Sequence, residues 1–497
     1  MEYISTRGNF RSVSSAEAIS LGMVPEGGLF VPRSIPELSL DAITAKKDAS
    51  YQELAQWIFK KFLTDFKDQE IEESVEAAYK EESFPPAAKT PLVKLNSNTF
   101  ILELWHGPTA AFKDMALQVL PQLLVRSVKK LGVKKEIVIL VATSGDTGKA
   151  ALEGFKDVEG VKIIVFYPEE GVSRVQEDQM KTTGGQNTDV VSLKGNFDDC
   201  QTAVKNVFAD QEFKKRMEAG NYQFSSANSI NWGRLLPQIV YYFKAYFELL
   251  NKDEIRAGEK INISVPTGNF GNILAAYYAY RMGLPVNKFI CASNDNKVLT
   301  DFLETGIYDT EREFKKTISP SMDILISSNL ERFLFEITGH DSEQIKQWYQ
   351  ELKTNNKFKI DEQTLAEIKE LFVGQYSTEK EARSTINNVF KKFNYLIDPH
   401  TAVGVDSLVK YRSQSADQKK AVVDSTASPY KFSRAVLESL KEKEINADEY
   451  RIIEELEALT ETEIHRGLKG LETMESRHQK SCRKDEIKKK IAEILNI

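Results

Sequence analysis

The sequence predicts an α/β fold whose mainly parallel sheets are covered by helices on both faces. Three observations support this prediction. From about residue 97, short apolar segments alternate with segments of helical periodicity. Gly-rich turns follow two of the apolar segments, where the binding sites of such folds usually lie. The 497 residues, of 56.3 kDa, are enough for about two to four domains.

The expected elements follow in order along the chain. Residues 1–96 mix short extended segments with helices, which are expected at residues 51–66 and 71–79. The alternating region predicts strands at residues 100–104, 136–142, 161–167, 260–265, 288–292 and 421–424. It predicts helices at residues 115–131, 149–155, 273–282 and 432–441.

We expect four units: an N-terminal domain of residues 1–96, two lobes of residues 97–215 and 216–455, and a helical tail of residues 456–497. The first boundary follows the pair Pro85-Pro86, which interrupts regular structure. The tail is charged and amphipathic. We expect it to pack on the body as a solvated helix, and a partner-binding helix is the less favoured alternative.

The composition argues against several classes of function. The formal net charge is −7 and no basic stripe offsets it, so nucleic-acid binding is not expected. The five histidines and three cysteines lack metal-ligand spacing, so no metal is expected. The longest apolar run, residues 137–142, is too short to span a membrane, and the N-terminus lacks a secretory signal. We therefore expect a cytoplasmic protein, either a monomer or a homodimer.

The most informative turn is PTGNFGN, at residues 266–272, which follows an apolar strand and opens a predicted helix. Free backbone N–H groups and the helix dipole favour phosphate at such a turn. Gly268 and Gly271 would let the backbone approach the oxygens closely. A strand–helix turn that binds nothing has the same pattern, so the motif alone leaves both interpretations open.

A second turn, TSGDTGK at residues 143–149, resembles a nucleotide-binding P-loop only in part. Thr143 stands at the first Gly position of that motif, and Ala150 replaces its magnesium-binding hydroxyl. Neither turn has the G-x-G-x-x-G spacing of nicotinamide-cofactor sites. We interpret the second turn as an anion site, such as one for a substrate carboxylate.

The third segment, HGPTAAFKDMALQ, contains Lys113 at the predicted start of a helix and beside Phe112. A helix N-terminus and an aromatic wall both disfavour the ammonium form, so the pKa of Lys113 is expected to fall. A solvated surface lysine is the alternative. Together, a phosphate turn, a carboxylate turn and a reactive lysine are what a pyridoxal 5'-phosphate enzyme needs.

The chain resembles the threonine synthases, pyridoxal-phosphate enzymes of the tryptophan-synthase-β fold type, also called fold type II. Nine stretches occur in the family's order: YISTRG, GMVPEGGLFVP, HGPTAAFKDMALQ, ATSGDTG, GNFDDCQ, NSINWGRLLPQIVYY, PTGNFGN, DPHTAVG and STASPYKF. One departure is the last stretch, because the family often has HPAKF where this chain has SPYKF at residues 428–432. The histidine of that pattern therefore has no counterpart here.

The resemblance implies a role for each motif. Lys113 would bind the cofactor aldehyde, Phe112 would lie near the cofactor ring, and Thr426 would face its pyridine nitrogen. The cofactor phosphate would lie on Gly268, Asn269, Phe270, Gly271 and Asn272. The substrate carboxylate would lie in the loop of Ser144, Gly145, Asp146 and Thr147. Arg234 is our candidate for the substrate phosphate, because guanidinium binds phosphate bidentately; a structural ion pair is its alternative.

The resemblance also implies the reaction, the conversion of O-phospho-L-homoserine and water to L-threonine and phosphate. A related pyridoxal-phosphate lyase that releases a keto acid and ammonia would share Lys113 and the phosphate turn. A non-catalytic protein that binds a small molecule or nucleotide is a further alternative. His106 and His400 lie inside the matching stretches, and we expect both to be structural.

Overall fold

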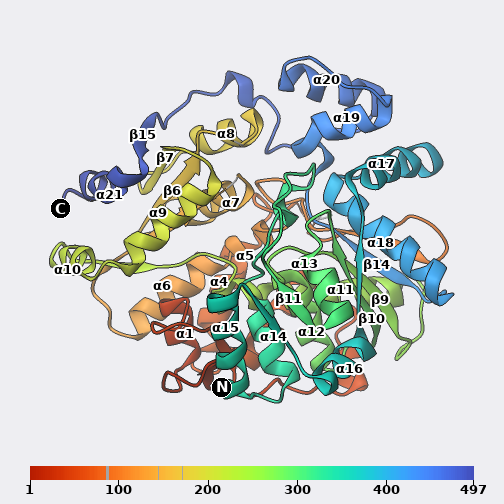
Figure 1. Ribbon diagram of the computed structural model, residues 1–497, viewed down its shortest axis with the longest axis horizontal. Helices are drawn as coiled ribbons and strands as arrows, with labels where there is room; N and C mark the ends of the chain where they lie inside the picture. Colours follow the sequence, from red (N-terminus) through yellow and green to blue (C-terminus); the bar gives the residue numbers. More distant parts are fainter. Residues whose placement is uncertain (86–88, 144, 171) are drawn as a thin grey trace.

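The computed structural model describes residues 1–85, 89–143, 145–170 and 172–497, and two sheets form its framework (Figure 1). The first sheet is parallel throughout, in the order β15-β7-β6-β5-β8. The second has the order β13-β10-β9-β14-β4-β3, and only β3 runs antiparallel to its neighbour. The expected two-lobed α/β fold with mainly parallel sheets is confirmed. The strands of these sheets are β3 (Leu92–Lys94), β4 (Thr99–Glu103), β5 (Glu136–Ala142), β6 (Val161–Pro168), β7 (Thr188–Lys194), β8 (Tyr222–Ser225), β9 (Ile261–Pro266), β10 (Val286–Ser293), β13 (Phe372–Tyr376), β14 (Ala421–Ser425) and β15 (Lys480–Arg483).

The first sheet is buried on both faces, which explains its nearly continuous runs of Val and Ile. Val138 and Leu140 of β5 face a core shared with α9 and α21, whereas Ile139 and Val141 face the core that contains α7. Side chains alternate across a strand, so one apolar run serves both faces. The helices of this lobe are α7 (Asp146–Phe155), α8 (Arg174–Lys181), α9 (Phe197–Ala209), α10 (Gln211–Ala219) and α21 (Ile487–Leu495).

The second sheet is covered in the same way. Ile263 and Val265 of β9 pack in the core that contains α12, whereas Val423 of β14 packs in the core that contains α18. The helices of this lobe are α11 (Trp232–Asn251), α12 (Gly271–Arg281), α13 (Val298–Thr305), α14 (Leu330–Ile337), α15 (Ser342–Asn355), α16 (Glu362–Leu371), α17 (Glu379–Phe393), α18 (Pro399–Ser415), α19 (Ser433–Lys441) and α20 (Glu449–Thr460). A small antiparallel pair, β11 (Ile307–Asp309) and β12 (Lys357–Lys359), accompanies them.

The N-terminal region shares its core with the second lobe. Tyr3 packs edge-on against Trp232 of α11, and its hydroxyl donates to the Phe62 carbonyl at 3.1 Å. The region consists of β1 (Tyr3–Ser5), β2 (Phe30–Pro32), α1 (Ser15–Leu21), α2 (Leu40–Thr44), α3 (Tyr51–Phe62) and α4 (Asp68–Ala78).

The structure differs from the expected elements in three places. The helix expected at residues 115–131 is two helices, α5 (Asp114–Leu117) and α6 (Leu120–Lys130), because Pro121 has no N–H and fits only a helix start. Strand β4, expected in the lobe of residues 97–215, pairs with β14 in the second sheet. The tail of residues 456–497, expected to be helical, contributes β15 to the edge of the first sheet.

The C-terminal segment therefore runs from one lobe to the other, and Figure 1 shows it passing from α20 beside α8 to β15. Short 3-10 turns complete the chain at η1 (Pro320–Met322), η2 (Pro429–Phe432), η3 (Leu471–Thr473) and η4 (Lys484–Glu486). Among the helices of the described ranges, none combines the length and apolarity that crossing a membrane requires. The described side chains also form no cluster of three or more His, Cys, Asp or Glu suited to a metal ion.

Candidate active site

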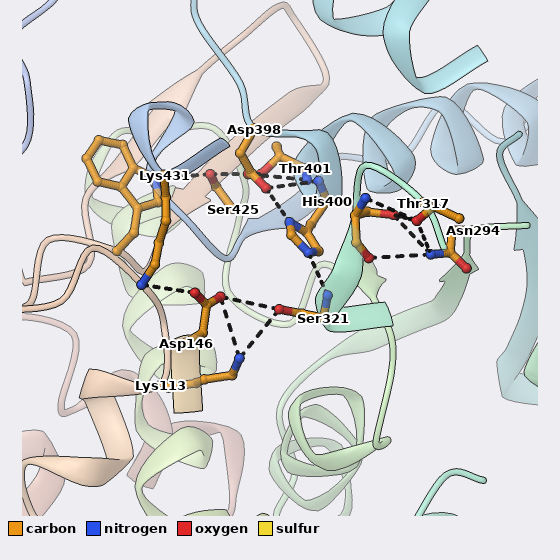
Figure 2. A network of polar contacts seen from close by, with 12 residues as sticks. Lys113, Asp146, Asn294, Thr317, Ser321, Asp398, His400, Thr401, Ser425 and Lys431 are labelled. Carbon is orange, nitrogen blue, oxygen red and sulfur yellow. Dashed lines mark hydrogen bonds and ion pairs between the residues drawn. The ribbon is translucent and has the colours of Figure 1, made fainter. Parts of the chain in front are cut away.

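Lys113 lies just before α5, with its amine inside the protein. The side chain is 13% exposed, and Nζ lies 3.4 Å from Ser321 Oγ and 3.6 Å from Asp146 Oδ2 (Figure 2). Burial lowers the pKa of Lys113 to about 8; Asp146 opposes this shift, whereas Lys431 and Arg234 add to it. The expected fall is confirmed, and the alternative of a solvated surface lysine is excluded. The Phe112 ring centroid lies 5.9 Å from Nζ.

Thr426 lies next to this lysine because the end of β14 pairs with the segment that precedes α5. The Thr426 carbonyl accepts a hydrogen bond from the Phe112 N–H at 2.8 Å, and Ala111 and Ala427 form an antiparallel bridge. Thr426 is 6% exposed. The structure thus brings Phe112, Lys113 and Thr426 together from distant parts of the sequence.

The predicted phosphate turn joins β9 to the start of α12, as its sequence indicates. Phe270 has a left-handed backbone, with φ of 59°, and Gly271 is the first residue of the helix. The first N–H groups of a helix have no partner within it, so the turn presents donors and the positive end of the dipole. A Cβ on Gly268 would lie 2.5 Å from the Ser321 carbonyl, so only glycine fits there.

A segment that sequence reasoning missed holds this turn in place. Ser327 Oγ donates to the Gly268 carbonyl at 2.8 Å, and Ser328 Oγ donates to Asn269 Oδ1 at 3.1 Å. Asn329 donates to the Asn269 carbonyl through both its backbone N–H, at 3.1 Å, and its Nδ2, at 3.0 Å. The only local signal is a run of short polar residues before a helix, which is common at helix starts.

Asn272 turns its side chain away from the helix start. Its Nδ2 donates to Asp424 Oδ2 at 2.9 Å, and the hydroxyls of Tyr241 and Tyr242 donate to its Oδ1. Burial raises the pKa of Asp424 to about 7. The predicted role of Asn272 toward a phosphate therefore rests on its backbone N–H, while its side chain anchors α12.

The predicted carboxylate turn lies at the start of α7, and its Asp146 lies beside Lys113. Its Ser144 lies outside the described residues. Asp146 Oδ1 accepts from Gln176 Nε2 at 2.7 Å and lies 3.0 Å from Lys431 Nζ. Burial alone would raise the pKa of Asp146, but Lys431 and Lys113 hold it well below its usual range. Gly145 has φ of 136°, and Thr147 is half-buried in the first turn of the helix.

Arg234 is buried in α11, and the structure excludes the structural ion pair considered for it. Its Nη1 donates to the Ala227 carbonyl at 3.0 Å, and no carboxylate of the described ranges lies within ion-pair distance. Its Nε has no partner among the described atoms. Burial lowers its pKa to about 10. A buried cation without an anion is costly, so the site is suited to an anionic ligand.

Ser321 is held beside Lys113 by a buried histidine, as Figure 2 shows. The Ser321 N–H donates to His400 Nε2 at 3.2 Å, and His400 Nδ1 lies 2.8 Å from Asp398 Oδ1. This arrangement gives the imidazole one donor and one acceptor nitrogen. The expected structural role of His400 is consistent with these contacts. His106 stacks on Trp105, with ring centroids 4.2 Å apart.

Known proteins share both the sequence and the structure. Family profiles described as "Threonine synthase N terminus", "Pyridoxal-phosphate dependent enzyme" and "Threonine synthase, C-terminal" match residues 2–79, 84–426 and 401–491. The threonine synthase of Saccharomyces cerevisiae is 38% identical over 468 residues, which is 88% of this chain and 89% of the yeast protein. The chain belongs to the threonine synthase family.

Two further members of the family extend the comparison. Threonine synthase-like 1 of Pongo abelii is 40% identical over 442 residues, or 87% of this chain, but this chain spans only 58% of that relative's length. A crystal structure of the pyridoxal-phosphate-bound threonine synthase of Brucella melitensis superposes with a TM-score of 0.88 at 37% identity. It covers 100% of this chain and 98% of the Brucella chain, so the whole fold is shared.

The residues of this structure fit pyridoxal 5'-phosphate, the cofactor of the family. Lys113 is a buried amine whose pKa is lowered to about 8, so a part of it is neutral near neutral pH and can react with an aldehyde. The turn of Gly268, Asn269, Phe270 and Gly271 offers N–H donors at a helix start, as a phosphate requires. When bound, the cofactor supplies an electron sink for carbanions next to the substrate nitrogen.

Proposed function

We propose that this chain is a threonine synthase, which converts O-phospho-L-homoserine and water to L-threonine and phosphate. One observation supports the proposal: the buried amine of Lys113 lies within electrostatic reach of the buried guanidinium of Arg234, which has no carboxylate partner in the described ranges. The guanidinium of Arg234 is near enough to lower the pKa of Lys113. A substrate phosphate would suit the guanidinium of Arg234, and a substrate amino group would react with the cofactor aldehyde that Lys113 would hold.

The chain's own residues suggest a division of work. The Lys113 amine, with its pKa near 8, accepts and donates protons near neutral pH, so it suits a proton carrier. Arg234 would bind the substrate phosphate and stabilise it as it leaves. The first N–H groups of α7, at Asp146 and Thr147, would hold the substrate carboxylate with Gly145 and Ser144.

The product formed from O-phospho-L-homoserine tests this proposal. The purified holoenzyme should release threonine and phosphate in equal amounts, and Lys113→Ala should release neither. Predominant formation of 2-oxobutyrate and ammonia would instead favour the related lyase. A wild-type protein that binds no pyridoxal phosphate would support the non-catalytic alternative.

We also infer that the protein acts in the cytoplasm as a monomer or homodimer. All three cysteines are buried and unpaired, which suits a reducing compartment. Cell fractionation and light scattering of the purified chain would test the two parts of this inference separately.

A further inference from the structure

Asp146 lies between two buried lysines, and only one of them has a role in the proposed reaction. Its Oδ2 faces Lys113 Nζ at 3.6 Å, and its Oδ1 faces Lys431 Nζ at 3.0 Å (Figure 2). The Lys431 side chain is completely buried, at 0% exposure. A buried ammonium is costly unless it is paired and hydrogen-bonded, so its position calls for an explanation.

Lys431 is fixed from two sides. It lies in η2, directly after β14, and its Nζ also donates to the Thr109 carbonyl at 2.8 Å. Thr109 in turn donates to Asp114 through its N–H at 2.8 Å and its hydroxyl at 2.7 Å. The ammonium is therefore held between the segment that carries Lys113 and the start of α7.

The Asp146 carboxylate is also held in place by hydrogen bonds. Gln176 Nε2 donates to Oδ1 at 2.7 Å, and Ser321 Oγ donates to Oδ2 at 3.3 Å. Each oxygen thus has a fixed direction, one toward Lys431 and the other toward Lys113. Among the groups that act on Lys113, Asp146 is the anion, and Lys431 and Arg234 are cations. The nearby Asp114 is occupied by Thr109.

We propose that Lys431 is a positioning residue of the active site, which holds the Asp146 carboxylate turned so that its second oxygen faces the Lys113 amine. The Lys431–Asp146 pair thereby sets the charge around the lysine that takes the cofactor. The importance of Lys431 for catalysis rests on the proposed function, but its pairing with Asp146 can be tested without measuring catalysis.

The two partners are expected to shift the pKa of Lys113 in opposite directions. Lys431→Met removes a like charge and leaves Asp146 to Lys113 alone, so the pKa of Lys113 should rise. Asp146→Asn removes the anion and leaves Lys113 facing Lys431, so the pKa of Lys113 should fall. A shift of about one pKa unit is expected each way for charges at this range. A pair whose charges were screened from Lys113 would give no such opposition.

The experiment measures the reactivity of Lys113 in the full chain freed of cofactor. Trace acetylation between about pH 6 and pH 11, read by mass spectrometry of the Lys113 peptide, gives the pKa of this one amine. The wild type should show about 8. In the holoenzyme, the pH midpoint of the visible cofactor band should rise in Lys431→Met and fall in Asp146→Asn.

The matched control is Lys149→Met, on the same helix as Asp146. Lys149 Nζ forms an ion pair with Glu153 at 2.9 Å and donates a hydrogen bond to Thr183 Oγ1 at 2.9 Å, so this variant breaks a similar ion pair elsewhere. It should leave the pKa of Lys113 unchanged. Where Lys431→Met does not fold, the double variant Asp146→Asn/Lys431→Met removes both charges and should shift the pKa less than Asp146→Asn alone.

Several outcomes would overturn the inference. The two single variants could shift the pKa of Lys113 in the same direction, or neither could shift it. The double variant could also shift this pKa as far as Asp146→Asn does. These results are independent of the proposed function. If the wild type makes no threonine, the proposed function is wrong, but the measured pKa values of Lys113 still test the pairing. If the wild type makes threonine and the variants leave the pKa of Lys113 unchanged, only the role of Lys431 is wrong.

Discussion

At the scale of single residues, the site combines two cations whose burial changes their chemistry in different ways. Lys113 is neutral in a substantial fraction near pH 8, so its amine can react. Arg234 stays charged, because even its lowered pKa is about 10. One residue is thus suited to covalent and proton chemistry, and the other to holding an anion.

The rate of cofactor uptake should follow the ionisation of Lys113. Only the neutral amine attacks an aldehyde, so uptake by the chain freed of cofactor should rise with pH and level off above about 8. Absorbance after mixing with pyridoxal phosphate measures this rate. Uptake that keeps rising toward the ordinary lysine pKa of about 10.4 would contradict the lowered pKa of Lys113.

Replacing Arg234 should weaken substrate binding without loss of the cofactor. A charge-assisted hydrogen bond contributes about 1.5–3 kcal/mol, so Arg234→Met should raise KM for O-phospho-L-homoserine about 10- to 100-fold. Cofactor content should be unchanged, as measured by the visible band. The unfolding temperature without ligand should not fall, since an unpaired buried charge is lost.

Arg412→Met is the control for this variant. Arg412 Nη1 donates to Thr99 Oγ1 at 2.7 Å, and its Nη2 donates to the Asn98 carbonyl at 2.7 Å, so its role is structural. It should lower the unfolding temperature and leave KM as in the wild type. An unchanged KM in Arg234→Met would remove Arg234 from the site.

At the scale of elements, the phosphate turn depends on contact with a distant loop. The backbone of Gly268 approaches the Ser321 carbonyl so closely that a Cβ would lie 2.5 Å from it. The same loop places Ser321 Oγ beside Lys113. Moving the turn therefore also moves a neighbour of the reactive amine.

Gly268→Ala should disturb this contact, and Gly271→Ala should not. A Cβ at Gly271 would have its nearest neighbour, Asn329 Nδ2, at 3.5 Å, an ordinary contact. Thermal unfolding without cofactor should show a loss of about 1–3 kcal/mol for Gly268→Ala, and little change or a slight gain for Gly271→Ala. Equal stability of the two variants would show that the turn adapts without cost.

At the scale of the whole molecule, the C-terminal segment completes one of the two cores of the first lobe. Ile487, Ile491 and Leu495 of α21 belong to the same core as Val138 and Leu140 of β5. Between the lobes, Gly467 lies so close to the Pro108 carbonyl that a Cβ would reach 2.2 Å from it. The segment thus passes next to the stretch that leads to Lys113.

Shortening one side chain of α21 should therefore destabilise the protein. Ile491 is 0% exposed, so Ile491→Ala should cost about 2–5 kcal/mol in the free energy of unfolding, measured with urea. Lys489→Ala on the same helix, whose partner Glu493 lies 4.0 Å away at the surface, should change it by less than about 0.5 kcal/mol. Equal effects would mean that α21 is only a solvated helix.

The sequence by itself determined the features that depend on neighbours in the chain. Buried runs of Val and Ile predicted β5 and β6, and strand–turn–helix chemistry predicted the phosphate turn. Lys113 and its lowered pKa followed from its position beside a helix start and an aromatic ring, although burial proved to be the main cause. These signals are local, because periodicity and turn residues act over a few positions.

Only the tertiary structure decided which distant side chains surround Lys113. Ser321, 208 positions away, carries no local signal of a site, since short polar residues are common on surfaces. Lys431 lies in the matching stretch STASPYKF, but nothing in that stretch indicates that its side chain pairs with Asp146. The pairing of β4 with β14 and of β15 with β7 was equally hidden. Such contacts are selected by burial and charge pairing across the folded chain, and these energies exist only once the lobes have assembled.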